Sequence, residues 1–395
     1  MNPFEFATAT RIIFGKDTAD QVADIVSASA FGKHALLVTS GQSSAAAADR
    51  LEQQLRDKGI QVTRYAVLSE PDVEIVEEGV RAAQSAGCDH VIALGGGSVI
   101  DTGKAIAGLL TNGGSVLDYV EVVGRGLPIR QPAAPLIALP TTAGTGAEVT
   151  RNAVIAVHEK QVKVSMRSPY LLPRVAVVDP VPTYTMPPAV TAGTGLDALT
   201  QLIEPFTSLR RNPLIDGIAE AGLKRAARSL LVAYREGTPA AREDMAFASL
   251  CGGLALANAG LGAAHGFAAV LGGRYPIAHG VCCAALLPHV VKGNMEALLK
   301  REPDSEVLDR YRTVAAYVAD RPRDSFKTHQ DVKSALVEKV SELCEALQIP
   351  KLSTCGVTME AVPELVAQAQ QASSMKANPL KLTTEELTEM LVAAI

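Results

Sequence analysis

Two patterns of apolar residues alternate over roughly the first 180 residues of the chain. Short runs rich in β-branched residues have the length and composition of strands, and the longer segments between them carry apolar residues at helical spacing. The predicted strands are 35–39, 62–68, 90–94, 136–139 and 175–178, and the predicted helices are 18–28, 44–58, 73–86 and 101–110. Strands that alternate with helices indicate a Rossmann-like α/β fold with a doubly wound, mostly parallel sheet. Such a domain binds nucleotides at the carboxyl ends of its strands.

The pattern changes after two proline clusters, Pro180-Val181-Pro182 and Pro187-Pro188. Beyond them the strand-like runs stop, and long patterns rich in Ala and Leu predict helices, for example over 218–234, 245–257 and 332–347. The sequence therefore predicts a nucleotide-binding α/β domain over residues 1–187 and an all-α C-terminal domain over residues 188–395.

One strand-to-helix junction carries the clearest chemical signal. The strand at 90–94 runs into Gly95-Gly96-Gly97, and Ser98 and Asp101 follow where a helix can begin. Glycines without Cβ atoms let backbone N–H groups approach a pyrophosphate, and a helix beginning near Ser98 directs its N-terminal dipole at the same anion. The spacing is not GxGxxG, so a tight turn with a good N-cap is the alternative interpretation.

The composition of the chain argues against two classes of partner, nucleic acids and membranes. The net charge is −5 and no block of Lys or Arg occurs, which argues against a nucleic-acid partner. Because no apolar run of about 20 residues and no signal-like N-terminus is seen, we expect a cytoplasmic protein that does not bind membranes. The six cysteines lack CxxC spacing and are therefore expected to be reduced, buried thiols.

Four motifs follow one another along the chain: GGGSVID at 95–101, PTTAGTGAEVT at 140–150, GTGLDALTQLIEPF at 193–206 and HGFAAVLGGRYPIAHGVCCAALLPHV at 265–290. With these motifs the chain resembles the iron-containing (group III) alcohol dehydrogenase family over almost its full length. The resemblance implies an NAD- or NADP-linked oxidoreductase that acts on a small-molecule alcohol or carbonyl substrate, with a divalent metal in a helical domain. Because dimers are common in that family, it also implies a homodimer.

Several residues are candidates for binding the cofactor. Hydroxyl groups in the loop after the strand at 136–139 can donate to phosphate or ribose, although a polar turn would have the same composition. Ser40 stands where the family often carries an Asp that repels a 2′-phosphate, so we expect NADPH to be accepted at least as well as NADH. By resemblance and position, the cofactor-binding set is Ser40, Gly96, Gly97, Ser98, Asp101, Thr141, Thr142, Thr145, Asn152 and Lys163.

The resemblance also implies a metal site formed by Asp197, Gln201, His265 and His279. The family uses one Asp and three His there, and this chain has Gln201 at one of the His positions. Asp197 and Gln201 are four residues apart, so they share one face of a helix. An amide oxygen is a weaker ligand than imidazole toward iron or zinc, so we expect the metal to be weakly bound or absent.

Two alternatives stay open at this point. Many family members carry a His where this chain has Ala269, and both departures suit a metal-independent reductase similar to the maleylacetate reductases. His265 or His279 would then be the catalytic electrophile or acid. The other alternative is a catalytically inactive nucleotide-binding subunit, against which a buried Asp beside two imidazoles argues. Arg151 directly follows the motif at 140–150, and Arg274 lies five residues before His279. Arginines beside segments expected to form the cleft suggest a substrate that carries a carboxylate.

Overall fold

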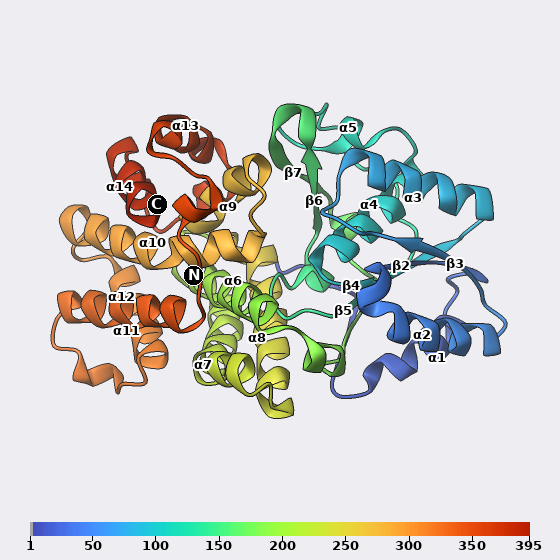
Figure 1. The fold of residues 1–395 in the computed structure, drawn as a ribbon, viewed down its shortest axis with the longest axis horizontal. Helices are drawn as coiled ribbons and strands as arrows, with labels where there is room; N and C mark the ends of the chain where they lie inside the picture. Colours follow the sequence, from blue (N-terminus) through green and yellow to red (C-terminus); the bar gives the residue numbers. More distant parts are fainter. Residues whose placement is uncertain (1–2) are drawn as a thin grey trace. The chain divides into compact units, whose positions relative to one another are not determined.

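The computed structural model describes residues 3–395 and divides into two compact units. The α/β unit comprises residues 7–142 and 146–185, and the helical unit begins at Met186 (Figure 1). The helical unit also includes residues 3–6 and Ala143–Thr145, a short segment from the middle of the α/β half. The expected domain boundary at residue 187 stays a prediction.

A six-stranded parallel sheet forms the centre of the α/β unit, in the strand order β1-β8-β5-β4-β2-β3. Its strands are β1 (Arg11–Phe14), β2 (His34–Thr39), β3 (Gln61–Ala66), β4 (His90–Gly95), β5 (Leu136–Pro140) and β8 (Val175–Val178). The doubly wound α/β fold is thus confirmed. Sequence analysis missed β1, a four-residue strand at the edge of the sheet whose two terminal residues are exposed.

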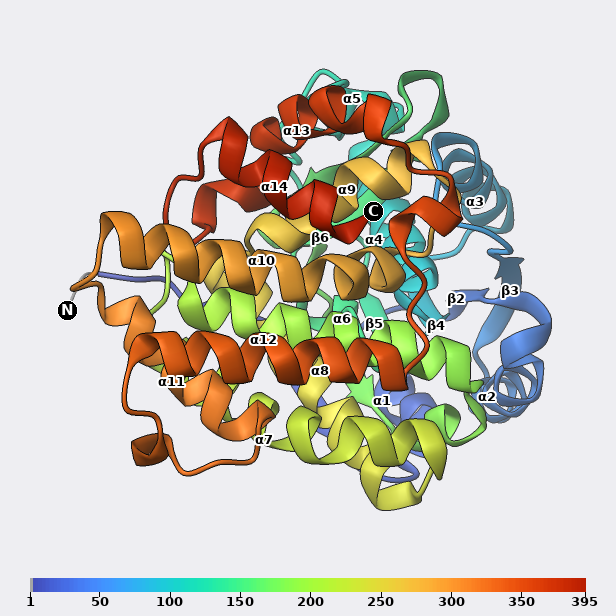
Figure 2. The ribbon, with the colours of Figure 1, turned by 60° about the vertical axis from the view of Figure 1, so that its left-hand side comes forward.

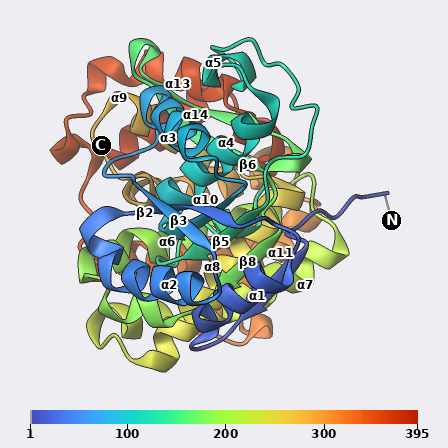
Figure 3. The ribbon, with the colours of Figure 1, turned by 90° about the vertical axis from the view of Figure 1, so that its right-hand side faces the viewer.

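Helices cover both faces of this sheet (Figure 3). Along β4, Val91 and Ala93 pack on one side with α3 and α4, and Ile92 and Leu94 pack on the other side with α1 and α2. Burial on both faces explains why the run Val91–Leu94 is continuously apolar rather than alternating with polar residues. The helices of this unit are α1 (Val22–Ala28), α2 (Ala45–Asp57), α3 (Val73–Ala86), α4 (Gly97–Asn112) and α5 (Val116–Tyr119).

An antiparallel hairpin, β6 (Asn152–Val157) and β7 (Val162–Arg167), lies outside the main sheet. Its turn passes through Gln161, which has a positive φ of 52°. This hairpin is not among the elements predicted from the sequence. Val162–Arg167 does alternate apolar with polar residues, but the turn before it lacks the Gly that usually marks a hairpin.

The helical unit is formed by longer helices (Figure 2). These helices bury one continuous apolar core. The proline pair at 187–188 ends the α/β half and also opens α6, where Pro188 occupies the first helical turn. Asn212, Thr238 and Thr328 cap later helices through their side chains. The helices are α6 (Pro188–Thr207), α7 (Pro213–Arg235), α8 (Pro239–Ala259), α9 (Ala263–Arg274), α10 (His279–Arg301), α11 (Glu306–Val318), α12 (His329–Ala346), α13 (Val362–Gln371) and α14 (Thr384–Ala394).

Over residues 3–395, no single helix has both the length and the hydropathy needed to cross a bilayer. Helices α8 and α9 reach that hydropathy only as a pair, which is bent by 99° at its break.

Candidate functional site

The candidate cofactor residues of the α/β unit follow three neighbouring strands. Thr39 of β2 pairs with Leu94 of β4, and Gly95 pairs with Pro140 of β5, so the three strands end at the same edge of the sheet. The chain leaves β2 toward β3 on one side, and it continues from β4 to β5 and β8 on the other side. The reversal between β2 and β4 is a topological switch point, where open α/β sheets bind their ligands.

The glycine turn after β4 lies at this switch point. Helix α4 begins at Gly97 with Gly96 as its N-cap, and within the described residues no side chain caps it. Its first N–H groups therefore suit an anionic ligand. A Cβ atom at Gly95 would lie 2.5 Å from Val99 Cγ2, and one at Gly96 would lie 3.3 Å from Thr142 Oγ1. Glycine is needed here because Val99 and Thr142 pack directly against the turn.

Two other candidates, Ser40 and Thr141, lie at the same edge of the sheet. Ser40 directly follows β2, and its hydroxyl oxygen accepts a hydrogen bond of 2.9 Å from Ser43 Oγ. The N–H of Thr141 donates to the carbonyl of Gly95 at 2.9 Å, which ties the loop after β5 to the end of β4. These candidates of the α/β unit thus gather at the switch point, and their contact with a cofactor stays a prediction.

Asp101 already has protein partners for both of its carboxylate oxygens. Oδ1 lies 3.3 Å from Lys104 Nζ, and Oδ2 accepts a hydrogen bond of 3.0 Å from the N–H of Val154. The Lys104 ammonium is fully buried and also donates to Thr150 Oγ1 at 2.7 Å and to the carbonyl of Asn152 at 2.8 Å. Burial raises the pKa of Asp101 and lowers that of Lys104, although each attracts the other's charge. This pair joins α4 to the β6–β7 hairpin, a role that sequence analysis missed.

Three other sequence candidates have protein partners too. Lys163 Nζ pairs with Glu70 Oε2 at 2.9 Å. Thr145 belongs to the helical unit, where its carbonyl accepts a hydrogen bond of 2.7 Å from Gln201 Nε2. The guanidinium of Arg274 binds Glu364 and lies 5.9 Å from the centre of the Tyr275 ring. The expectation of a carboxylate-bearing substrate therefore loses one of its two supports.

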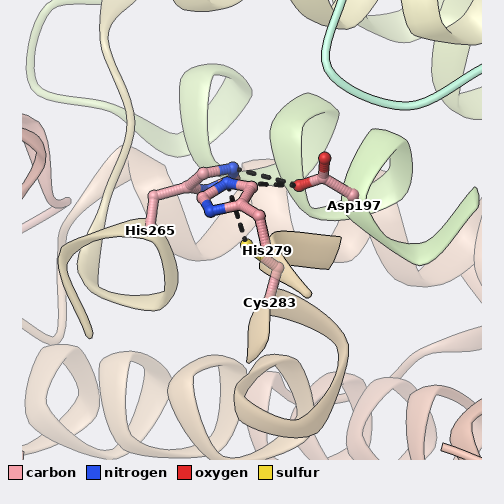
Figure 4. Close-up of side chains that lie close together, drawn as sticks. All are labelled: Asp197, His265, His279 and Cys283. Carbon is pink, nitrogen blue, oxygen red and sulfur yellow. Dashed lines mark hydrogen bonds and ion pairs between the residues drawn. The ribbon is translucent and has the colours of Figure 1, made fainter. Parts of the chain in front are cut away.

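The helical unit brings Asp197, His265, His279 and Cys283 together (Figure 4). One possible ligand atom from each residue lies within 4.8 Å of the others. Asp197 Oδ1 is 3.3 Å from His265 Nε2 and 3.9 Å from His279 Nε2, and Cys283 Sγ is 3.7 Å from His279 Nε2. Asp197 comes from α6 and His265 from α9. His279 opens α10, and Cys283 follows one helical turn later on the same face.

Glu204 orients His265 within this cluster. Its carboxylate accepts hydrogen bonds from the N–H groups of Gly262 at 2.9 Å and Ala264 at 2.7 Å, and Oε2 lies 2.7 Å from His265 Nδ1. Because a carboxylate accepts, Nδ1 donates, so in the neutral imidazole Nε2 carries the lone pair and faces the cluster. A carboxylate behind an imidazole in this way is typical of metal-binding histidines.

A cation fits the centre of the cluster. Asp197 Oδ1 and His265 Nε2 are buried, and within the described residues neither has a hydrogen-bond partner of acceptable geometry. Two electron-rich atoms that face each other at 3.3 Å repel unless a proton or a metal ion lies between them. Carboxylate, imidazole and thiolate are all ligands of divalent transition metals.

The electrostatics of the cluster also favour a bound cation. Burial works to raise the pKa of Asp197, but the close approach of His265 and the charges of both imidazoles outweigh it, so the pKa is lowered. Burial works to lower the pKa of both histidines, but the negative charges around them prevail. Cys283 and Glu204 raise the pKa of His265 well above its usual value, and Cys283 and Asp197 raise that of His279 to about 9. The carboxylates of Asp197 and Glu204 favour any cation bound in the cluster.

Sequence analysis missed Cys283 and Glu204. Cys283 follows His279 by four residues, and that spacing on a helix could have indicated a shared ligand face. The role of Glu204 cannot be predicted from local spacing, because its partners lie in the distant segment that leads into α9. Gln201 lies on α6 one turn after Asp197, and its amide nitrogen is held by Thr145.

Comparisons with known proteins agree with this architecture. Residues 9–180 match the family described as iron-containing alcohol dehydrogenase, and residues 191–395 match the C-terminal region of the Fe-containing alcohol dehydrogenase family. Alcohol dehydrogenase 4 of Saccharomyces cerevisiae (strain YJM789) is 33% identical over 384 residues, which cover 96% of each chain.

Solved structures of two related proteins are also similar. A 1,3-propanediol oxidoreductase superposes with a TM-score of 0.90 at 32% identity, over 100% of both chains. The sulfoacetaldehyde reductase of Bifidobacterium kashiwanohense, solved in complex with NAD+, has a TM-score of 0.85 at 29% identity, over 99% of this chain and 98% of that one. With both regions of the sequence matched and the fold shared from end to end, the chain belongs to the iron-containing alcohol dehydrogenase family.

Proposed function

We propose that this protein interconverts an alcohol and an aldehyde or ketone by hydride transfer with NAD or NADP, assisted by a divalent metal in the helical unit. The observation that carries the metal is the pair of facing, buried acceptors, Asp197 Oδ1 and His265 Nε2, with His279 and Cys283 beside them. A buried cluster of four possible ligand atoms, with a carboxylate behind one imidazole, is better explained by metal binding than by packing of the core.

The α/β unit would hold the cofactor. The uncapped N-terminus of α4 and the close-packed glycine turn suit the pyrophosphate, and the hydroxyls of Thr141 and Thr142 follow the neighbouring strand. Ser40 carries no charge where an acidic side chain would repel a 2′-phosphate, so both NADH and NADPH are expected to bind.

The helical unit would stabilise charge on the substrate oxygen. A metal ion bound there acts as a Lewis acid toward the oxygen on which negative charge develops during hydride transfer. Asp197, His265, His279 and Cys283 are the side chains that would hold the ion, and Glu204 keeps His265 in the tautomer that can bind it. His279 is the most exposed of the four, with 35% of its side chain accessible.

A metal-independent reductase is the second candidate. Two residues favour it. Gln201 stands where the family has a His, and its amide nitrogen donates to the carbonyl of Thr145. Ala269 stands where many members have another His, so one ionisable group fewer is present. In that case His279, the accessible imidazole, would act as the proton donor.

One experiment separates the two candidates. The purified protein is analysed for metals, and NADH and NADPH oxidation is measured over a panel of aldehydes and ketones before and after treatment with a chelator. Loss of activity on chelation, restored by added Zn²⁺ or Fe²⁺, supports the metal-assisted reaction. Full activity in protein free of metal would overturn it in favour of the second candidate. Size-exclusion chromatography tests the homodimer, and fractionation of cells tests the cytoplasmic location.

A further inference from the structure

We propose that Cys283, and not Gln201, is the fourth protein ligand of the metal, so that the ion is held by one carboxylate, two imidazoles and one thiolate. This inference rests on the proposed metal-assisted function. It replaces the ligand set expected from the family resemblance, and it changes which metal the site should prefer.

The distances within the cluster suit one central ion. In a tetrahedral zinc site with the usual bond lengths, nitrogen and oxygen ligands lie roughly 3.4 Å apart, and a sulfur lies roughly 3.6 Å from a nitrogen. Asp197 Oδ1 is 3.3 and 3.9 Å from the two imidazole nitrogens, and Cys283 Sγ is 3.7 Å from His279 Nε2. These three distances are close to the spacing that a shared ion requires, and the other pairs of ligand atoms lie within 4.8 Å.

Cys283 is held in this position by its helix. It lies one turn after His279 on α10 and is fully buried, with its sulfur directed at the imidazoles (Figure 4). A side chain on a packed helix keeps its place without any ordering of a loop, so the thiolate can bind an ion without backbone movement.

The side chain of Gln201 forms a hydrogen bond outside the cluster. Its Nε2 donates a hydrogen bond of 2.7 Å to the carbonyl of Thr145, and a Cβ atom at Gly252 would lie 3.3 Å from the same nitrogen. We therefore assign Gln201 to the contact that joins α6 to the segment Ala143–Thr145. Even with its oxygen turned toward the cluster, an amide is neutral, whereas a thiolate adds a second negative charge to that of Asp197.

The choice of ligand has a consequence for the metal. Two anionic ligands balance the charge of a divalent ion, and thiolate sulfur favours Zn²⁺ and other borderline-soft ions over harder ones. This chain should therefore bind zinc firmly, although it lacks a His that its family has at position 201.

Cobalt provides a direct probe of the sulfur ligand. The protein is freed of metal by dialysis against a chelator and titrated with Co²⁺, while its absorption spectrum is recorded. A thiolate bound to Co²⁺ gives a charge-transfer band in the near ultraviolet that nitrogen and oxygen ligands do not give. We expect this band in the wild-type protein at one Co²⁺ per chain.

Matched variants identify the sulfur. Cys283→Ser should lose the band and weaken Zn²⁺ binding by at least about tenfold in a competition with a chromophoric chelator, since loss of a ligand costs no less than loss of a supporting residue. Cys282→Ser, which changes the adjacent buried cysteine, and Gln201→Ala should both keep the band. In the Cys283→Ser background, Gln201→His should restore Zn²⁺ affinity without restoring the band.

Three results would overturn the inference: a wild-type Co²⁺ complex without the charge-transfer band, a band that persists in Cys283→Ser, or a band that disappears in Gln201→Ala. The first of these leaves the proposed function intact, because the metal would still be bound through other ligands. If neither Co²⁺ nor Zn²⁺ binds and the protein still reduces carbonyl compounds, the metal-assisted function itself fails.

Discussion

Glu204 shows how a single residue outside the ligand cluster can control it. The substitution Glu204→Gln removes the negative charge behind His265. It also leaves one amide oxygen as the acceptor for three donors, the N–H groups of Gly262 and Ala264 and Nδ1 of His265. We expect Zn²⁺ affinity to fall roughly 10- to 100-fold, as for other residues that support metal-binding histidines. Competition with a chelator measures this affinity.

The matched control is Glu302→Gln, which makes the same change at an exposed position. Circular dichroism should show that both variants keep their helices. Equal Zn²⁺ affinities in the two variants would mean that Glu204 only supports the backbone of α9.

A substitution of Ser40 tests whether this single residue affects the preference between NADPH and NADH. A carboxylate introduced by Ser40→Asp at the end of β2 would lie where we expect the adenosine ribose. It would repel a 2′-phosphate by about 1 kcal/mol or more, which corresponds to at least roughly fivefold in relative affinity. The ratio of kcat/KM for NADPH to that for NADH should therefore fall in the variant. A wild-type protein that already prefers NADH by a large factor would contradict this assignment.

At the scale of elements, the short 3-10 helix η3 (Ala147–Val149) buries a carboxyl group, that of Glu148. Burial raises its pKa to about 7, although its own backbone N–H and Lys104 both work to lower it. Since the folded state holds this proton more tightly than the unfolded state, Glu148 favours folding below its ordinary pKa of 4.5. That contribution is lost as the pH rises from 4.5 to about 7.

The predicted loss can be measured with Glu148→Gln, which cannot ionise. A shift of this size corresponds to about 3 kcal/mol once the group is ionised. The variant and the wild type should have similar Tm values near pH 4.5, and the variant should become the more stable of the two by pH 8. Glu159→Gln, at an exposed position, should show no such divergence. A Tm difference between Glu148→Gln and wild type that does not change with pH would refute the shift.

The elements also show which signals in the sequence are reliable. Strands β2, β4, β5 and β8 were predicted because both of their faces are buried, which leaves continuous apolar runs. The edge strand β1 and the hairpin strands β6 and β7 were missed, because their pairing depends on contacts rather than on composition. The helix predicted from residue 101 begins earlier, at Gly97, since glycines have low helix propensity but are needed in this turn.

At the scale of the whole molecule, metal binding should stabilise the folded protein. An ion that binds the assembled cluster and not the unfolded chain adds about 2.7 kcal/mol to the free energy of unfolding at a free concentration of 100 times its Kd. We expect the Tm to fall after treatment with a chelator and to recover more fully with Zn²⁺ than with Mg²⁺, whose preferred ligands are all oxygen. In the matched variant Cys283→Ser, the same concentration of Zn²⁺ should raise the Tm by less than in the wild type, because the ion binds more weakly. Equal recovery with Mg²⁺ would show that the cluster is not the site of the effect.

The class of fold and the glycine turn after β4 can be predicted from the sequence, and the resemblance of its motifs to a known family adds three members of the cluster: Asp197, His265 and His279. Hydrophobic periodicity and motif spacing are local properties, so they can be read along the chain without knowing which segments meet. Only the tertiary structure showed that Cys283 completes the cluster, that Glu204 orients His265 and that Asp101 is bound by Lys104. The contacts of Cys283 with Asp197 and of Glu204 with His265 depend on how helices distant in sequence pack against one another, and side-chain distances of 3 to 4 Å are set by that packing. Asp101 and Lys104 lie on one helix, but both form hydrogen bonds with the distant strand β6.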